Sequence, residues 1–247
     1  GEGRGHSMSD RAGEDQRTLW FEGGEKEPPP RRGLSRTADV AIASLGLVLS
    51  SPLLLIAAIA IKLSSRGPVL YRQRRVGKDG EVFELFKLRT MLRGADPVGV
   101  GTAVTAEDPR VTPVGRLLRR FSLDELPNLI NVLRGEMGIV GPRATLPAQV
   151  ALYTPRQRRR LELRPGVTGW AQIHGRAGIP WEERIELDVW YVKNRSLRLD
   201  LLILARTPKA LLGGAGDVAV DPYAGSPADS PLRIAAEREE AGRSGEK

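Results

Sequence analysis

The chain has 247 residues and a formal net charge of +8, which predicts an anionic partner such as nucleic acid, anionic lipid or a phosphorylated substrate. It has no cysteine and only two histidines, which excludes a disulfide framework and a thiolate zinc site and argues against a Ser-His-Asp triad. Any metal should therefore be a hard, carboxylate-bound ion such as Mg²⁺. Aromatic residues make up 5% of the chain, which argues against a base-stacking surface, so no nucleic acid is expected.

Composition divides the chain into four regions. Residues 1–33 and 213–247 are polar, rich in small residues and proline, and without hydrophobic periodicity, so they are predicted to be a disordered leader and a flexible C-terminal tail. Residues 34–66 contain a long apolar run, and residues 67–212 carry strand-like and helix-like patterns. The expected fold class is α+β and mostly helical: a membrane helix, then a cytoplasmic globular domain with a small β-hairpin and interfacial amphipathic helices.

The apolar run covers residues 40–61 and contains no charged side chain. It is long enough for a helix to cross a bilayer, which takes about 20 residues. A buried helix of a water-soluble protein is the alternative, but such a helix rarely runs this far without a polar face. The run is too long for a signal peptide and no small-residue cleavage site follows it, so membrane insertion is predicted.

The middle of this run is interrupted by Ser51 and Pro52. Proline removes one backbone hydrogen bond, and a nearby serine hydroxyl can satisfy the carbonyl that is set free. Basic residues flank both ends of the run, and basic flanks stay on the cytoplasmic side. These flanks are Arg31, Arg32 and Arg36 before it, and Lys62, Arg66, Arg72, Arg74, Arg75 and Lys78 after it. A re-entrant helix-break-helix satisfies both flanks, and a simple span is the alternative.

Two strand-like segments follow, at residues 69–76 and 81–91, on either side of the turn sequence GKDG. They predict a β-hairpin. The period of two places Lys87 and Arg89 on one face of the second strand. That face is either a solvated surface or a pair of donors for a phosphate, and spacing alone does not decide between them.

Helical patterns occupy most of the remaining chain, near residues 113–134 and at 154–164, 181–194 and 197–212. Thr154 and Gln157 form a capping box for the second of these, whose five arginines either are solvated or lie against lipid headgroups. Asp188 falls within an apolar stripe of the third, so it should meet a basic residue or a metal, with a structural ion pair favoured. The last segment is strongly apolar and is predicted to be an interfacial helix.

The adjacent acids Asp124 and Glu125 lie in the sequence FSLDELPNLI, among several arginines. Acids in the first turn of a helix are common as caps, so the pair alone does not establish chemistry. Neighbours on a helix diverge by about 100°, so the two carboxylates would take different tasks. A carboxylate that attacks phosphorus needs arginine, lysine or Mg²⁺ to neutralise its target, and this chain supplies such groups beside a membrane segment.

Four motifs together resemble a known family: FKLRTM, SLDELPNLINVLRGEMGIVGPR, RPGVTGWAQIHGR and LDVWYV. They are similar to those of the bacterial sugar transferases, the monotopic polyprenyl-phosphate phosphoglycosyl transferases, over roughly residues 34–212. The likeness is to the minimal catalytic form, since no further transmembrane pattern precedes residue 40. It implies transfer of sugar 1-phosphate from a UDP-sugar to undecaprenyl phosphate with release of UMP, as the first membrane step of exopolysaccharide, capsule or glycoconjugate synthesis. The implied location is the bacterial inner membrane, with the catalytic domain, residues 67–212, on the cytoplasmic face.

The resemblance also implies residue roles. Asp124 would attack the β-phosphate and carry a covalent phosphosugar with Mg²⁺ bound close by, and Glu125 would assist the second half-reaction by positioning or deprotonating the lipid phosphate. Ser51 and Pro52 match the break of the family's re-entrant helix, and Arg143 matches an arginine expected to contact substrate phosphate. Further basic positions are assigned loosely to phosphate or uridine binding: Lys87, Arg89, Arg110 and Arg120.

Two positions depart from the family pattern, and one rival function stays open. Ala144 stands where the family usually has proline, and His174 stands where it usually has asparagine, so a substrate contact at 174 is in doubt and a structural role is expected. The rival is a membrane-tethered basic adaptor that binds anionic lipid or nucleic acid. It would explain the charge and the membrane helix but not the acid pair. A homodimer is compatible with the sequence.

Overall fold

The computed structural model describes residues 32–95, 108–174 and 179–212, so the predicted leader and tail lie almost wholly outside the described residues. As predicted, the described part is mostly helical and contains a small two-stranded hairpin and one long apolar helix. The α-helices are α2 (Arg36–Ser64), α3 (Pro113–Arg120), α4 (Asn128–Arg134), α5 (Pro147–Ala151), α6 (Pro155–Arg158), α7 (Trp170–Ile173), α8 (Trp181–Asn194) and α9 (Leu197–Leu212). Short 3₁₀ turns are η1 (Lys78–Gly80), η2 (Leu123–Glu125) and η3 (Arg159–Glu162).

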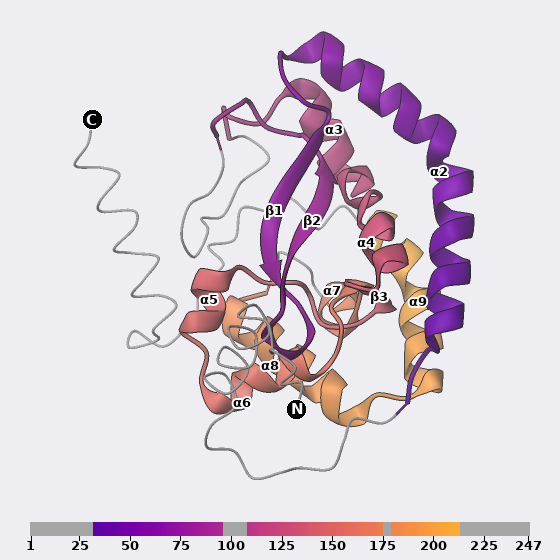
Figure 1. Cartoon of the computed structure of the whole chain (residues 1–247), viewed down its shortest axis with the longest axis vertical. Coiled ribbons are helices and arrows are strands. Elements are labelled where there is room, and N and C mark those ends of the chain that lie inside the picture. Colours follow the sequence, from indigo (N-terminus) through magenta and orange to yellow (C-terminus); the bar gives the residue numbers. More distant parts are fainter. Residues whose placement is uncertain (1–31, 96–107, 175–178, 213–247) are drawn as a thin grey trace, which may run out of the picture.

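Helix α2 is one continuous helix of 29 residues with Pro52 inside it. The Ser51 hydroxyl donates to the carbonyl of Val48 at 2.8 Å, the acceptor that Pro52 leaves without its usual partner. The helix curves about midway along its length (Figure 1). Where the sequence predicted a break, the helix is therefore bent but continuous. The Ser51 hydroxyl replaces the hydrogen bond that Pro52 removes, as expected of a serine beside a proline.

Both halves of α2 lie against the same globular body. Near its start, the Asp39 carboxylate accepts the backbone N–H of Ile139 at 3.0 Å. Near its end, Ala57 and Ile61 pack in a small core with Leu118 of α3. The outward side exposes large apolar side chains: Leu45, Val48, Leu49, Leu55, Ile56, Ile59 and Leu63. Within the described residues, α2 alone is long and apolar enough to cross a membrane.

Strands β1 (Leu70–Val76) and β2 (Val82–Leu88) form the predicted antiparallel hairpin, in the register Leu70 opposite Leu88. Its turn is tight because Asp79 and Gly80 both take positive φ, 55° and 82°. A second pair, β3 (Gly138–Val140) and β4 (Gly166–Thr168), is parallel and was not predicted. These strands are too short to show a period in the sequence.

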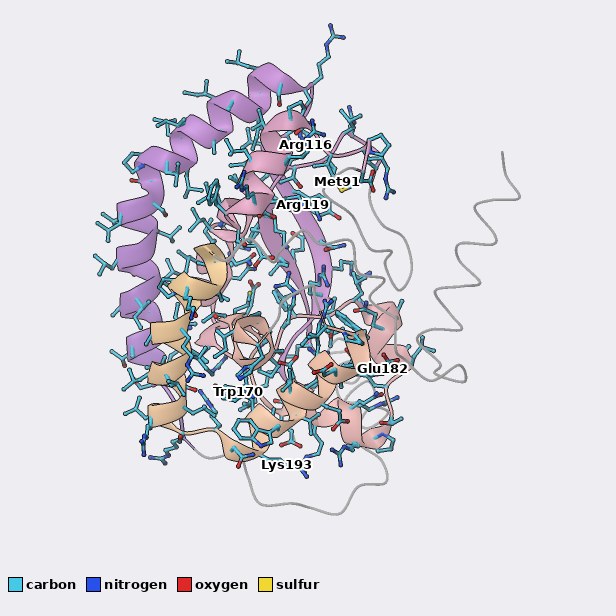
Figure 2. All side chains as sticks on the ribbon, turned by 180° about the vertical axis from the view of Figure 1, so that it is seen from behind. Met91, Arg116, Arg119, Trp170, Glu182 and Lys193 are labelled. Carbon is cyan, nitrogen blue, oxygen red and sulfur yellow. The ribbon has the colours of Figure 1, made fainter. Side chains whose placement is uncertain are left out.

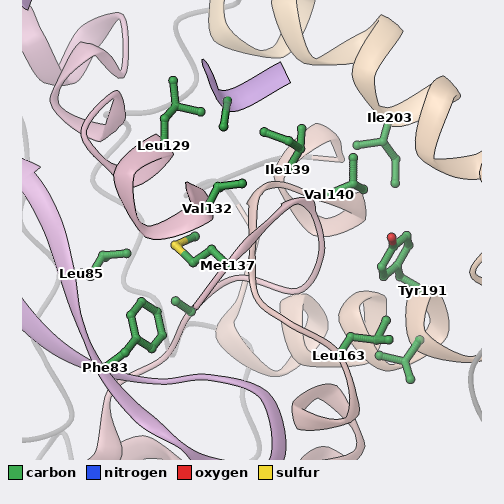
Figure 3. Close-up of a cluster of buried hydrophobic side chains, with 13 residues drawn as sticks. Phe83, Leu85, Leu129, Val132, Met137, Ile139, Val140, Leu163, Tyr191 and Ile203 are labelled. Atoms are coloured by element: carbon green, nitrogen blue, oxygen red, sulfur yellow. The ribbon is translucent and has the colours of Figure 1, made fainter. Parts of the chain in front are cut away.

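The main hydrophobic core joins the hairpin, α4, β3 and the C-terminal helices (Figure 3). Phe83 and Leu85 enter it from β2, and Tyr191 and Ile203 enter from α8 and α9. Ala43 of α2 is also a member, so the apolar helix is packed into the domain on one side. The core therefore fixes the long apolar helix α2 relative to the segments that carry the acid pair.

The segment predicted as one arginine-rich helix is shorter than expected. The capping box of Thr154 and Gln157 is confirmed, but the helix proper ends at Arg158 and continues as the turn η3. One of its arginines, Arg160, is 2% exposed and thus belongs to the interior, so neither the solvated nor the headgroup interpretation holds for it.

Candidate active site

The acid pair lies in η2, a single 3₁₀ turn between α3 and α4. Ser122 precedes it in the left-handed conformation, with φ of 54°, which turns the chain sharply after α3. The pair is thus in a turn just before α4 rather than in the first turn of a longer helix. Asp124 and Glu125 both line one cavity, so the chain presents two adjacent carboxylates to the same space.

Glu125 is held by two cations. Its Oε1 accepts from Lys87 Nζ and from Arg143 Nη2, each at 2.7 Å. Burial would raise the pKa of Glu125, but the charges of Arg143 and Lys87 outweigh it and hold the pKa well below its usual range. Glu125 is therefore ionised at neutral pH and fixed in place.

Asp124 is in the opposite situation. Its side chain is buried, and within the described residues no hydrogen bond or ion pair to its carboxylate is found. Burial raises the pKa of Asp124 to about 6, even though Lys87 acts to lower it. A carboxylate without a partner next to a fixed, paired one is suited to act as a nucleophile or a metal ligand.

The main chain of the loop that carries Arg143 is held by a buried ion pair. Arg160 and Asp188 are 2% and 1% exposed and bond directly to each other. The backbone N–H of Arg143 donates to Asp188 at 3.3 Å, and Arg160 donates to the carbonyl of Arg143 at 3.0 Å. Arg160 also donates to the Tyr153 hydroxyl at 2.6 Å. The predicted ion pair of Asp188 is confirmed, and it fixes the main chain from which Arg143 reaches Glu125.

The cavity has a volume of about 400 Å³ and a mixed lining. One part is charged, with the acid pair facing Lys87, Arg119 and Arg143. Another part is apolar and lies between α2 and α9, which run side by side (Figures 1 and 2). A third part is lined by polar groups from α7 and α8: Gln172, Trp181, Arg184 and Asp188.

Three predicted phosphate-binding residues do not line this cavity in the described part of the chain. Arg89 donates to the carbonyls of Ser65 and Arg66 at 2.9 and 2.7 Å, so it clamps the end of α2 to the hairpin. Arg110 pairs with Asp108 at 2.6 Å, and Arg120 lies over the ring of Phe121. Their positions give no support to the expected phosphate contacts, because side-chain direction within a strand or helix depends on packing that spacing alone does not fix.

Arg119, which was not predicted, takes the place expected of Arg120. It lies at the end of α3 and lines the cavity with the acid pair (Figure 2). Burial of Leu118 against α2 sets the rotation of α3 and thereby turns Arg119 inward. The sequence GRLLRR offers two adjacent arginines and no signal to choose between them.

The two departures from the family pattern have structural roles. His174 bonds through Nδ1 to the carbonyl of Trp170 at 2.8 Å and packs on the Trp170 ring, as expected of a structural histidine. Ala144 is buried, and its carbonyl accepts from Arg75 at 3.3 Å. That bond restrains the loop at the position where proline would otherwise stiffen it.

Within the described residues, no group of three or more His, Cys, Asp or Glu side chains is placed to hold a metal ion. Mg²⁺ is nevertheless bound in many sites by one or two carboxylates, with water and substrate phosphates completing the shell. Asp124 fits that donor set because its carboxylate faces the cavity without a protein partner, whereas Glu125 is already occupied by two cations.

Comparison with known proteins gives a consistent set of relatives. The family model described as bacterial sugar transferase matches residues 30–214. An uncharacterized sugar transferase of Bacillus subtilis, EpsL, is 44% identical over 74% of this chain and 89% of its own. The UDP-glucose:undecaprenyl-phosphate glucose-1-phosphate transferase of Caulobacter vibrioides is 47% identical over 72% of this chain and 69% of its own. The exopolysaccharide production protein ExoY of Sinorhizobium fredii is 41% identical over 74% and 87%.

Proposed function

Because the chain belongs to the bacterial sugar transferase family, we propose that it transfers a sugar 1-phosphate from a UDP-sugar to a polyprenyl phosphate such as undecaprenyl phosphate, with release of UMP. Relatives whose names state this reaction, or a role in exopolysaccharide production, support the reaction class and the pathway type. The observation that carries the mechanism is the contrast between an unpartnered Asp124 and a fixed Glu125 in one basic cavity.

In the first half-reaction, the Asp124 carboxylate attacks the β-phosphorus of the donor. A bond forms between the carboxylate oxygen and phosphorus, the bond from phosphorus to the bridging oxygen breaks, and UMP leaves with that oxygen. Lys87, Arg119 and Arg143 line the same cavity and would neutralise the charge of the diphosphate. The pKa of about 6 leaves Asp124 mostly ionised at neutral pH, as a nucleophile must be.

In the second half-reaction, an oxygen of the polyprenyl phosphate attacks the same phosphorus and releases the Asp124 carboxylate. Glu125 orients Lys87 and Arg143 for this step through its two 2.7 Å bonds. Its low pKa makes it a weak base, which favours positioning over deprotonation of the lipid phosphate. The two neighbouring acids thus divide the work between nucleophile and organiser.

Mg²⁺ would bind at Asp124 together with the donor's phosphates and water, which is the coordination that this ion prefers. When bound there, it would withdraw charge from the diphosphate and assist departure of UMP. The protein's own contribution is the single available carboxylate and the three cationic side chains around it.

The membrane segment supports a monotopic arrangement. Both halves of α2 lie against one globular body, and basic residues flank both ends, so a helix that enters and leaves on the cytoplasmic side satisfies charge and packing together. The bend at Pro52 lets the outward, apolar side of α2 face lipid. The catalytic cavity then lies at the cytoplasmic surface of the inner membrane.

The deciding experiment is intact-protein mass spectrometry after incubation of the detergent-solubilised chain with UDP-sugars and Mg²⁺, without acceptor. We expect the added mass of one phosphosugar, and no such mass for Asp124→Asn. Full activity of Asp124→Asn would refute the assignment. A basic adaptor, the rival function, would release no UMP from any UDP-sugar.

A further inference from the structure

The cavity has a second, apolar part that the chemistry at Asp124 does not use. Its lining includes residues of the long apolar helix, of α4 and of the last helix: Ile42 and Gly46 of α2, Leu129 of α4, and Leu204, Thr207 and Leu211 of α9. Ile42 and Gly46 are four residues apart, and Leu204, Thr207 and Leu211 follow at intervals of three and four. Each helix therefore presents one face to this space.

The same two helices expose large apolar side chains close to the residues that line the cavity. Leu45 and Leu49 project from α2, and Leu197 and Leu201 project from α9. Contiguous exposed apolar surface of this kind marks contact with lipid or another apolar partner. The cavity between α2 and α9 therefore opens beside the face that would meet the bilayer.

A ligand that fills both parts must carry an anionic head and an apolar chain. The head belongs at Lys87, Arg119 and Arg143, and the chain belongs between Ile42 and Leu204. The polar part at Gln172 and Arg184 suits the hydroxyl-rich sugar of the donor instead. The two substrates can then approach Asp124 from different sides.

We propose that the space between α2 and α9 is the entry channel and binding groove for the first isoprene units of the polyprenyl phosphate acceptor. Gly46 lines this groove without a side chain. A Cβ at position 46 would lie 3.0 Å from Leu129 Cδ1, so any larger residue there would press against Leu129 and narrow the groove. Thr207 bonds to Thr168 of β4 at 2.8 Å and so holds α9 at the groove's far wall. This inference rests on the proposed function for the identity of the acceptor.

The direct test uses the unaltered protein and a photoreactive polyprenyl phosphate with a diazirine on the isoprene unit nearest the phosphate. After irradiation in detergent, peptide mass spectrometry should find the label on the lining residues Ile42, Gly46, Leu204 and Leu211. Unlabelled polyprenyl phosphate should compete, and polyprenol, which lacks the phosphate, should not. Labelling restricted to Leu45, Val48 and Leu49, or labelling near Gln172, would overturn the proposal.

Substitution gives an independent test with matched controls. Ile42→Trp and Leu211→Trp should fill the groove, whereas Val48→Trp and Leu202→Trp place the same ring on the outward faces of the same helices. The groove variants should still release one UMP per enzyme without acceptor, while their KM for polyprenyl phosphate should rise about tenfold or more. An acceptor KM that matches the controls would overturn the groove.

The reaction at Asp124 and the binding groove can be tested separately. If the wild type releases no UMP from any UDP-sugar, the proposed function fails, and the competed photolabel still reports whether an amphiphilic phosphate occupies the groove. If UMP release and the Asp124 adduct are intact but the label lies elsewhere, the proposed groove is contradicted and the proposed reaction is retained.

Discussion

Two acid–arginine clusters contact the loop that carries Arg143, and both border the cavity. In the cavity, Glu125 binds Lys87 and Arg143, and the Arg143 side chain remains 40% exposed. In the second, sealed cluster, Asp188 binds Arg160, and both side chains are almost fully buried. Solvent access separates the two clusters: the open one is expected to exchange its partners for substrate phosphates, whereas the sealed one holds the main chain at Arg143.

The largest effect is expected from breaking the sealed cluster. Arg160→Met leaves Asp188 buried without its counter-charge, which typically costs about 3–5 kcal/mol of the free energy of unfolding. We expect a lower thermal midpoint in detergent and loss of adduct formation, because Arg143 loses its backbone support. The double variant Arg160→Met/Asp188→Leu should recover most of the stability, since no unpaired charge remains. Equal stability of the single variant and the wild type would contradict the role assigned to this pair.

A substitution in the open cluster should lower the reaction rate and leave the thermal stability nearly unchanged. Arg143→Ala is expected to lower the rate of adduct formation about 100-fold, as for loss of one preorganised group that stabilises transition-state charge. Because its side chain is partly exposed, the thermal midpoint should change little. Single-turnover UMP release measures the first quantity, and thermal unfolding measures the second. A loss of stability as large as that of Arg160→Met would erase the distinction between the clusters.

The pH profile of adduct formation probes the acid that belongs to neither cluster. The pKa of Asp124 is raised to about 6 by burial, so the reactive carboxylate is present above this pH and is lost by protonation as the pH falls through it. Below pH 6 the rate should fall about tenfold per pH unit. Lys87→Met removes a charge that lowers the pKa of Asp124, so it should move the acid limb to higher pH. An unchanged limb in Lys87→Met would show that another group controls the profile.

The two clusters also show which features of the structure could be predicted from the sequence and which could not. The hairpin, the apolar helix, the capping box at Thr154 and the pairing of Asp188 follow from local patterns, and the structure confirms them. The sequence did not separate Arg119 from Arg120, or identify Arg160 as a buried residue. Those assignments depend on how a short helix or turn is rotated by its packing, and adjacent arginines carry no periodic signal for that rotation.

The β3–β4 pair is a part of the backbone that the sequence did not predict. Gly141 and Gly166 approach so closely that a Cβ at Gly166 would lie 2.1 Å from the Gly141 nitrogen. This contact sets the start of the Arg143 loop, yet its two strands are only three residues each and lie far apart in the chain. Motif resemblance identified the loop as important, and only the tertiary structure explains its position.

The smallest effect is expected at a third ion pair, between Arg156 and Glu186, whose side chains are 64% and 47% exposed. Arg156→Ala should change the free energy of unfolding by less than about 1 kcal/mol, because exposed pairs gain little over hydration. Helix α6 lies on the side of the molecule away from α2 (Figure 1), which favours the solvated alternative for this arginine over contact with lipid headgroups. Cosedimentation with anionic vesicles should therefore be the same for Arg156→Ala and the wild type. A clear loss of vesicle binding would instead place α6 against headgroups and would require the membrane-facing side of the domain to extend well beyond α2 and α9.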